Sequence, residues 1–151
     1  MNQHDLLKSI DKDAVVRAIE AAEKACSGEI RVHIEPKCHG RDVRFVAERT
    51  FERLGMTRTA LRNGVLIFLA AKEQQFAVIG DSGIHDKVGP AFWEDVAAHM
   101  TEAFREGEFT RGVVGAVREV GDSLAIHFPH AGTSDRNELT NEISMGEDRE
   151  T

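Results

Sequence analysis

The sequence predicts an α/β fold, namely a single three-layer α/β/α domain whose small mixed sheet is covered by about four helices. Three observations lead to this prediction. Residues 64–71 are nearly all apolar, and an uninterrupted apolar strand is typical of a sheet covered on both faces. A second apolar run, residues 76–79, follows the polar tip 72–75, which predicts an antiparallel hairpin. The flanking segments carry apolar residues at helical spacing.

Four segments have the apolar periodicity of helices. They are residues 11–25, residues 43–54, a segment that opens near Pro90 and a segment that follows Thr110. A glycine follows each of the first three, and Phe128-Pro129 follows the last, so each segment has a stop signal. We expect a loop between Asp81 and Pro90.

Residues 30–34 alternate between apolar and polar, which predicts a half-buried strand at the edge of the sheet. Pro36 closes this strand, because proline cannot donate to a sheet ladder. His33 falls on the polar face, and we expect it to lie on the surface. A helix joins this strand to the central strand 64–71, so these two strands run parallel and the hairpin partner runs antiparallel.

The chain divides into an α/β domain, residues 1–128, and an acidic tail, residues 129–151. In the tail six acidic residues outnumber two arginines, so more than half of the net charge of −7 lies there. This composition is typical of a solvated segment. Leu139, Ile143 and Met145 are nevertheless apolar, which favours docking on the domain, addition of an edge strand, or contact with another protein.

Composition and charge exclude several classes of protein. A net charge of −7 argues against binding to nucleic acid. The first residues lack the pattern of a signal peptide, and no apolar run is long enough to span a membrane, so we expect a cytoplasmic protein. Cys26 and Cys38 fall near opposite ends of the first strand, too far apart for a disulfide, and we expect two reduced thiols.

The strand directions bring several segments to one edge of the sheet. The third strand ends there at Asp81, and the first strand begins there at Glu29. The loop 56–63, the start of the helix near Pro90 and the end of the last helix reach the same edge. This convergence predicts the position of a functional site.

Oxygen-bearing side chains at this edge indicate a site for a divalent cation, Ca²⁺ or Mg²⁺, with a regulatory or interaction role. Calcium takes six to eight oxygen ligands in flexible geometry. The candidate ligands are Asp81, Glu29, Asp86, Asn63 and Glu138. Ser82 and His85 lie beside Asp81, and we expect them to support the ligands rather than to bind the cation.

Two alternatives remain open. The first is a metal-dependent phosphomonoesterase, in which the helix that begins near Pro90, together with Arg58 and Arg62, would contact the anion. The carboxylates at this edge repel phosphate more strongly than a helix dipole attracts it, so a cation or the arginines must neutralise the site first. The second alternative is an interaction module without chemistry, whose protein partner is unknown.

Short motifs give the chain a family resemblance. They are Gly28-Glu29-Ile30, Asn63-Gly64-Val65-Leu66, Gly80-Asp81-Ser82-Gly83-Ile84 and Phe104-Arg105-Glu106-Gly107-Glu108-Phe109. In this order and spacing they resemble the TPM domain over about residues 11–128. The end of the chain, residues 137–146, is similar to a small soluble bacterial subgroup of this family. The resemblance implies an α/β/α fold and divalent metal or calcium binding, and the family is often labelled phosphatase.

Overall fold

The three predicted strands form a mixed sheet in the computed structural model, which describes residues 8–130 and 143–146. Strand β1 (Glu29–Glu35) pairs in parallel with β2 (Gly64–Ala70), from Glu29 opposite Gly64 to Glu35 opposite Ala70. Strand β3 (Gln75–Gly80) returns antiparallel to β2. Every residue of β2 is buried, because β2 lies between two strands and under helices on both faces. The predicted directions are confirmed.

A short fourth strand comes from the tail. Strand β4 (Ser144–Met145) runs parallel to β1, and Ser144 lies opposite His33. The strand order is therefore β3-β2-β1-β4. Of the three fates that the apolar tail residues favoured, the described part of the tail adopts the edge strand.

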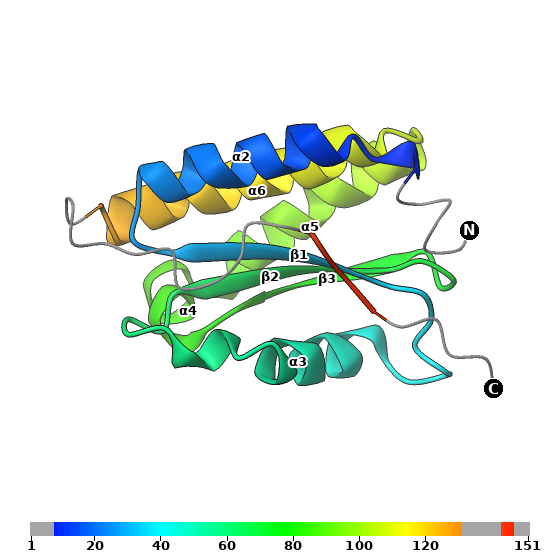
Figure 1. Ribbon diagram of the computed structural model, residues 1–151, viewed down its shortest axis with the longest axis horizontal. Helices are drawn as coiled ribbons and strands as arrows, with labels where there is room; N and C mark the ends of the chain where they lie inside the picture. Colours follow the sequence, from blue (N-terminus) through cyan, green and yellow to red (C-terminus); the bar gives the residue numbers. More distant parts are fainter. Residues whose placement is uncertain (1–7, 131–142, 147–151) are drawn as a thin grey trace.

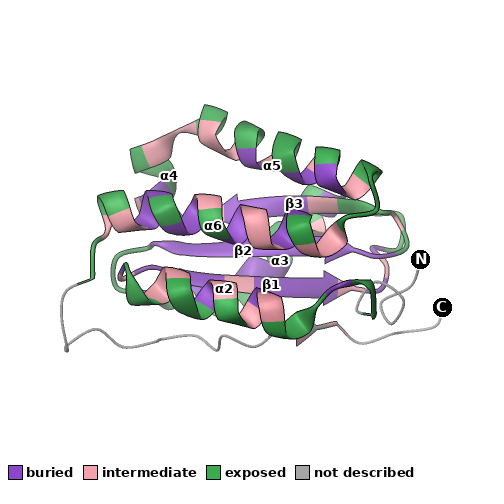
Figure 2. Ribbon diagram, turned by 90° about the horizontal axis from the view of Figure 1, so that it is seen from above, coloured by how far each residue is buried: buried purple, intermediate pink, exposed green. Residues whose placement is uncertain are grey.

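Helices cover both faces of the sheet (Figure 1). Three helices lie over one face: α2 (Lys12–Lys24), α5 (Pro90–Arg105) and α6 (Phe109–His127). On the other face lie α3 (Val43–Arg53) and the short 3-10 helix η1 (Met56–Arg58). In Figure 2 the strands are mostly buried, whereas the outer faces of the helices are exposed. The three-layer architecture predicted from the sequence is confirmed.

Alternation of side chains along the strands separates two apolar cores. Successive residues of a strand point to opposite faces. Ile30, Val32 and Ile34 therefore pack toward α2, α5 and α6, whereas Leu66 and Phe68 pack toward α3. All five side chains are at most 1% exposed, so each helical layer covers the strand residues that face it.

The segment between Asp81 and Pro90 differs from the predicted loop. It contains the helix α4 (Ser82–Val88), whose first backbone amide donates to the Asp81 carboxylate at 2.7 Å. Gly89, with φ of 75°, ends α4, and Pro90 begins α5. Sequence periodicity missed this helix because it is only seven residues long.

Cys26 and Cys38 are both buried thiols. Burial, with help from Glu73, Glu35 and Asp42, raises the pKa of the Cys38 thiol to about 11. Because the thiolate is the reactive form of cysteine, this thiol is unreactive near neutral pH.

Two glycines of α6 test how closely α2 and α6 pack. A Cβ atom at Gly121 would lie 2.6 Å from the Cβ of Ala22 on α2, whereas a Cβ at Gly115 would meet nothing within 4 Å. We expect Gly121→Ala to lower the free energy of unfolding by about 1–3 kcal/mol, since the helices must separate. Gly115→Ala should raise it by about 0.5–1 kcal/mol through helix propensity. Urea unfolding of both variants checks this, and equal effects would contradict the tight contact.

Candidate functional site

The segments predicted to converge do meet at one edge of the sheet, where β1 and β2 begin and β3 ends. We call this the lower edge. The Glu29 amide donates to the Asn63 carbonyl at 3.5 Å, and the Asp81 amide donates to the Gly64 carbonyl at 2.9 Å. The end of α6 reaches the same place, because the Ser27 amide donates to the Phe128 carbonyl at 2.8 Å. The predicted convergence is confirmed.

The Asp81 carboxylate is bound by an arginine. Arg62 Nε donates to Asp81 Oδ2 at 2.6 Å, and Arg62 Nη2 donates to Oδ1 at 2.8 Å. Asp81 is 6% exposed, and its hydrogen bonds raise the pKa of the Arg62 guanidinium above its usual value. This bidentate pair also orients Asp81 as the N-cap of α4. A cation at Asp81 would therefore have to displace a guanidinium.

Backbone packing holds the Arg62 loop against α4. Arg62 has φ of 51°, and its carbonyl accepts from the Gly83 amide at 2.8 Å. A Cβ at Gly83 would lie 2.1 Å from the Leu61 carbonyl oxygen, so only glycine allows this approach. The motif Gly80-Asp81-Ser82-Gly83 thus has a structural explanation: its aspartate caps the helix and its second glycine admits the loop.

A second acidic group at the lower edge is a pair of carboxyls, Glu23 and Glu29. Glu23 Oε2 accepts from the Ile30 amide at 2.9 Å, and Glu29 is 2% exposed. Burial raises the pKa of Glu23 to about 8, with contributions from the charge of Glu29 and a hydrogen bond to it. Glu23 therefore keeps a proton near neutral pH.

Sequence reasoning missed Glu23, although a signal was present. Glu23 lies four residues after Ile19, on the helical stripe that turns toward the sheet. An acid on such a stripe needs a partner in the core. Asn63, which is 1% exposed, lies beside this pair and donates to Ser27 Oγ at 3.4 Å.

The other predicted site residues are spread over the surface of the lower edge. Arg58, Ser82 and Asp86 are exposed, and His85 accepts from the Trp93 indole at 3.0 Å. Glu138 lies outside the described residues. Within residues 8–130 and 143–146, no three His, Cys, Asp or Glu side chains gather closely enough to hold a metal ion. The proposed ligands thus share an edge without forming one acidic cluster.

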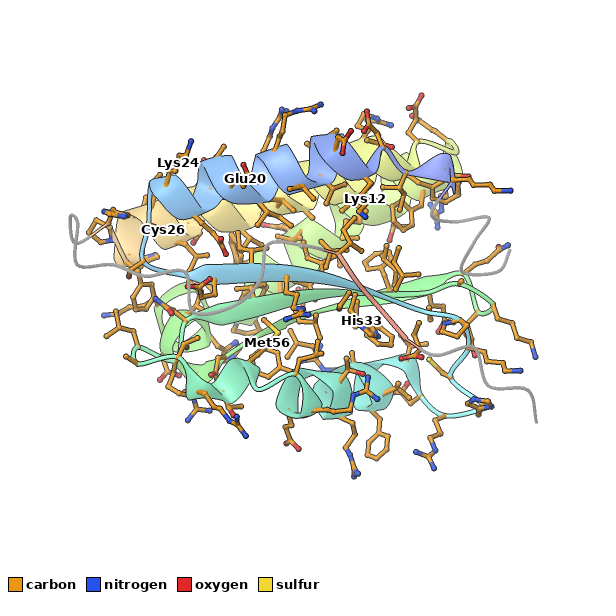
Figure 3. All side chains as sticks on the ribbon, in the orientation of Figure 1. Lys12, Glu20, Lys24, Cys26, His33 and Met56 are labelled. Atoms are coloured by element: carbon orange, nitrogen blue, oxygen red, sulfur yellow. The ribbon has the colours of Figure 1, made fainter. Side chains whose placement is uncertain are left out.

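At the opposite edge, where β1 ends, His33 is not the surface residue that we expected. It is 2% exposed and stacks on Phe68, with ring centroids 5.6 Å apart (Figure 3). Its Nδ1 lies 2.7 Å from Ser144 Oγ and its Nε2 lies 3.1 Å from Glu35 Oε1. The expectation was wrong because β4 and α3 cover this face, and Ser144 is more than a hundred residues away.

Ser144, His33 and Glu35 thus form a row of polar contacts. Glu35, at the end of this row, also lines a groove beside α3. Arg53 lies 3.9 Å from Glu35, and the groove, of about 510 Å³, is lined by three arginines: Arg41, Arg49 and Arg53. Glu35 and Glu52 also line the groove, so the row Ser144–His33–Glu35 ends beside three arginines and two carboxylates. The sequence shows these arginines only as scattered charges around α3.

The architecture defines a class of α/β/α domains with two parallel strands and an antiparallel hairpin strand. Comparison with known families places the chain within it: the family model of the TPM domain matches residues 1–123. The chain belongs to the TPM domain family, as its motifs predict. No curated protein matches it at a significant level. Within the described residues, no helix has the length and apolar character needed to cross a membrane.

Solved structures agree with this assignment. The NMR structure of the BA42 protein from the psychrophilic bacterium Bizionia argentinensis is 41% identical and superposes with a TM-score of 0.81. That match covers 89% of this chain and 92% of BA42. The N-terminal domain of the cg2496 protein from Corynebacterium glutamicum is 15% identical, with a TM-score of 0.52 over 91% of this chain and 76% of that domain. The second likeness shows the fold alone.

The Glu23–Glu29 pair predicts that stability falls as pH rises. The unfolded chain releases the Glu23 proton near pH 4.5, whereas the folded chain keeps it until about pH 8. The folded state binds more protons over this window, so the free energy of unfolding decreases across it. Glu23→Gln keeps a hydrogen-bond donor but cannot ionise, and we expect it to flatten this slope. Urea unfolding at several pH values from 5 to 9 measures it. Glu102→Gln, at an exposed position of α5, should keep the wild-type slope; an unchanged slope in Glu23→Gln would contradict the pairing.

Proposed function

We propose that the lower edge binds a divalent cation, Ca²⁺ or Mg²⁺, through the carboxyl groups of Glu23 and Glu29. The observation that carries this proposal is that the Glu23 and Glu29 carboxyls lie together in a mostly buried position, where burial raises the pKa of Glu23 and so keeps a proton on it near neutral pH. A divalent cation would replace that proton and neutralise both charges at once. A bound cation would reverse the effect of burial on these carboxyls, because its positive charge favours their ionised forms.

Neutral oxygen atoms are available to complete the coordination. The Asn63 side chain and the Ser27 hydroxyl lie beside the start of β1, and hard cations accept amide, hydroxyl, carbonyl and water oxygens as well as carboxylates. This set keeps two of the ligands predicted from the sequence, Glu29 and Asn63. It adds Glu23 and leaves Asp81 to Arg62 and the cap of α4.

A calcium titration followed by amide NMR tests this proposal. We expect saturable shifts at residues 23–30 and 63, and a rise in melting temperature, because a ligand bound only by the folded state stabilises it. Glu23→Gln should weaken binding at least about tenfold, since it removes one anionic ligand. Glu102→Gln, at an exposed position of α5, is the control and should bind like the wild type.

The same titration decides between the two ligand sets. Asp81→Ala should lose about 1 kcal/mol or more of stability, because it removes the N-cap of α4, yet keep the calcium affinity. Loss of affinity in Asp81→Ala but not in Glu23→Gln would place the cation at the ligands predicted from the sequence. A wild-type protein that is indifferent to millimolar Ca²⁺ and Mg²⁺ would contradict cation binding altogether.

Phosphomonoester hydrolysis is a second candidate, favoured by the row Ser144–His33–Glu35 beside the arginine groove. The name of the matched family model also carries the word phosphatase. In this reaction the Ser144 hydroxyl would give its proton to His33 Nδ1 while its oxygen forms a bond to phosphorus. The bond from phosphorus to the leaving alcohol would break, and that alcohol would take the proton. Water would then hydrolyse the phosphoserine and release inorganic phosphate.

Steady-state turnover of p-nitrophenyl phosphate, with and without Mg²⁺ or Ca²⁺, tests this candidate. Ser144→Ala should abolish turnover, because no other hydroxyl lies on His33 in the described part of the chain. Ser82→Ala, an exposed serine at the lower edge, should retain it. Equal turnover in both variants would contradict the role of Ser144. If the protein shows neither turnover nor cation binding, an interaction module without chemistry is the remaining proposal. The cytoplasmic location stays a prediction.

A further inference from the structure

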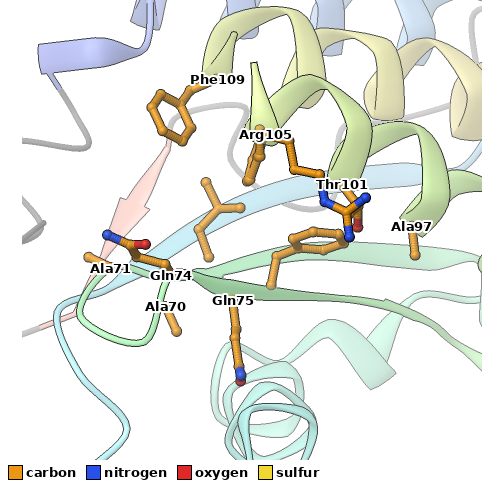
Figure 4. A pocket seen from close by; sticks show the side chains of 11 residues that line it. Ala70, Ala71, Gln74, Gln75, Ala97, Thr101, Arg105 and Phe109 are labelled. Atoms are coloured by element: carbon orange, nitrogen blue, oxygen red, sulfur yellow. The ribbon is translucent and has the colours of Figure 1, made fainter. Parts of the chain in front are cut away.

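A cavity of about 610 Å³ lies at the upper edge, the end of the sheet opposite the Glu23–Glu29 pair. It opens between the β2–β3 hairpin and the facing parts of α5 and α6 (Figure 4). Its volume falls in the range of small-molecule sites. None of its lining residues belongs to the lower edge, so neither the proposed cation site nor the Ser144 row accounts for it.

One wall of the cavity is aromatic and fixed. The Phe104 ring contacts Phe76 and Phe109 edge to face, with centroids 5.5 and 5.2 Å away. Gly112 on α6 seats the Phe104 ring, because a Cβ there would lie 2.6 Å from it. Leu69 adds an aliphatic side chain to this wall. The surface is therefore preformed for a flat or extended apolar group.

The rim carries one charge, and that charge is positive. Arg105 is exposed, and Figure 4 shows its guanidinium beside Thr101 at the cavity. In the described part of the chain Arg105 makes no ion pair. The neighbouring carboxylate, Glu106, accepts from Arg111 at 2.5 Å. Gln74 and Gln75 supply the remaining polar groups, and no acid is among the residues that line the cavity.

We infer that this cavity binds a small amphipathic carboxylate, with its apolar body against the phenylalanine wall and its carboxylate on Arg105. A planar guanidinium binds a carboxylate through two parallel hydrogen bonds. A single negative charge fits better than two, because the net charge of −7 and the neighbouring Glu106 repel an added anion. The inference gives a role to the motif Phe104–Phe109, whose Phe104, Arg105 and Phe109 line the cavity.

Matched ten-carbon probes test the inference. Sodium decanoate carries the carboxylate, decanamide is its neutral counterpart, and decyltrimethylammonium carries the opposite charge. Amide NMR titrations of the full-length chain should shift residues 74–76 and 101–109 with decanoate. We expect decanoate to bind at least about tenfold more tightly than decanamide, the size expected for a hydrogen-bonded charge pair. The ammonium probe should bind more weakly than either.

Two variants separate the charge from the cavity. Arg105→Gln should reduce the affinity for decanoate to that for decanamide, whereas Arg118→Gln, an exposed arginine on α6 outside this cavity, should leave both unchanged. Ala97→Trp should fill the cavity and abolish binding of both probes. Equal affinities for decanoate and decanamide in the wild type, or shifts confined to other surfaces, would overturn the inference. Unchanged decanoate affinity in Arg105→Gln would also overturn it.

Discussion

Strand β2 is buried on both faces and on both sides, and the rest of the molecule depends on that burial. Its seven apolar or small residues pair with β1 on one side and with β3 on the other, while two separate cores cover its faces. A one-residue change of register would turn each core residue to the wrong face. The pairing therefore fixes where β1 begins and where β3 ends. These two points bring Glu29 and Asp81 to the same edge.

Much of this arrangement could be predicted from the sequence, because it follows from long apolar runs and from the handedness of a strand–helix–strand unit. The partners of polar side chains could not. Asp81 was placed correctly, yet its pairing with Arg62 depends on a left-handed backbone at Arg62 that no periodicity reveals. The sequence places Glu23 on the helical stripe that faces the sheet, but it does not show that Glu29 of the next element lies beside it. His33 was misplaced because strand alternation reports which face a residue occupies, not whether a distant segment covers that face.

Strand β1 unites the polar features of both edges. Its residues at every second position are polar: Glu29, Arg31, His33 and Glu35. Burial lowers the pKa of the Arg31 guanidinium below its usual value, so this row is partly removed from water along its length. The row begins in the Glu23–Glu29 pair and ends beside the arginines of α3. Alternation of apolar and polar residues usually indicates that the polar side chains face solvent. In β1 these polar side chains are instead largely covered.

Strand β4 also covers part of the outer side of β1. An open strand edge presents unpaired amides and carbonyls that can accept a strand from a neighbouring chain. On β1 two different devices close this edge: the Glu23 carboxylate binds the Ile30 amide, and β4 pairs beside His33 and Ile34. The Gly146 amide extends the cover by donating to the Ile34 carbonyl at 2.9 Å, where a Cβ would collide with Glu35. Residues 144–146 thus cover the part of β1 on which a strand of another chain could otherwise pair.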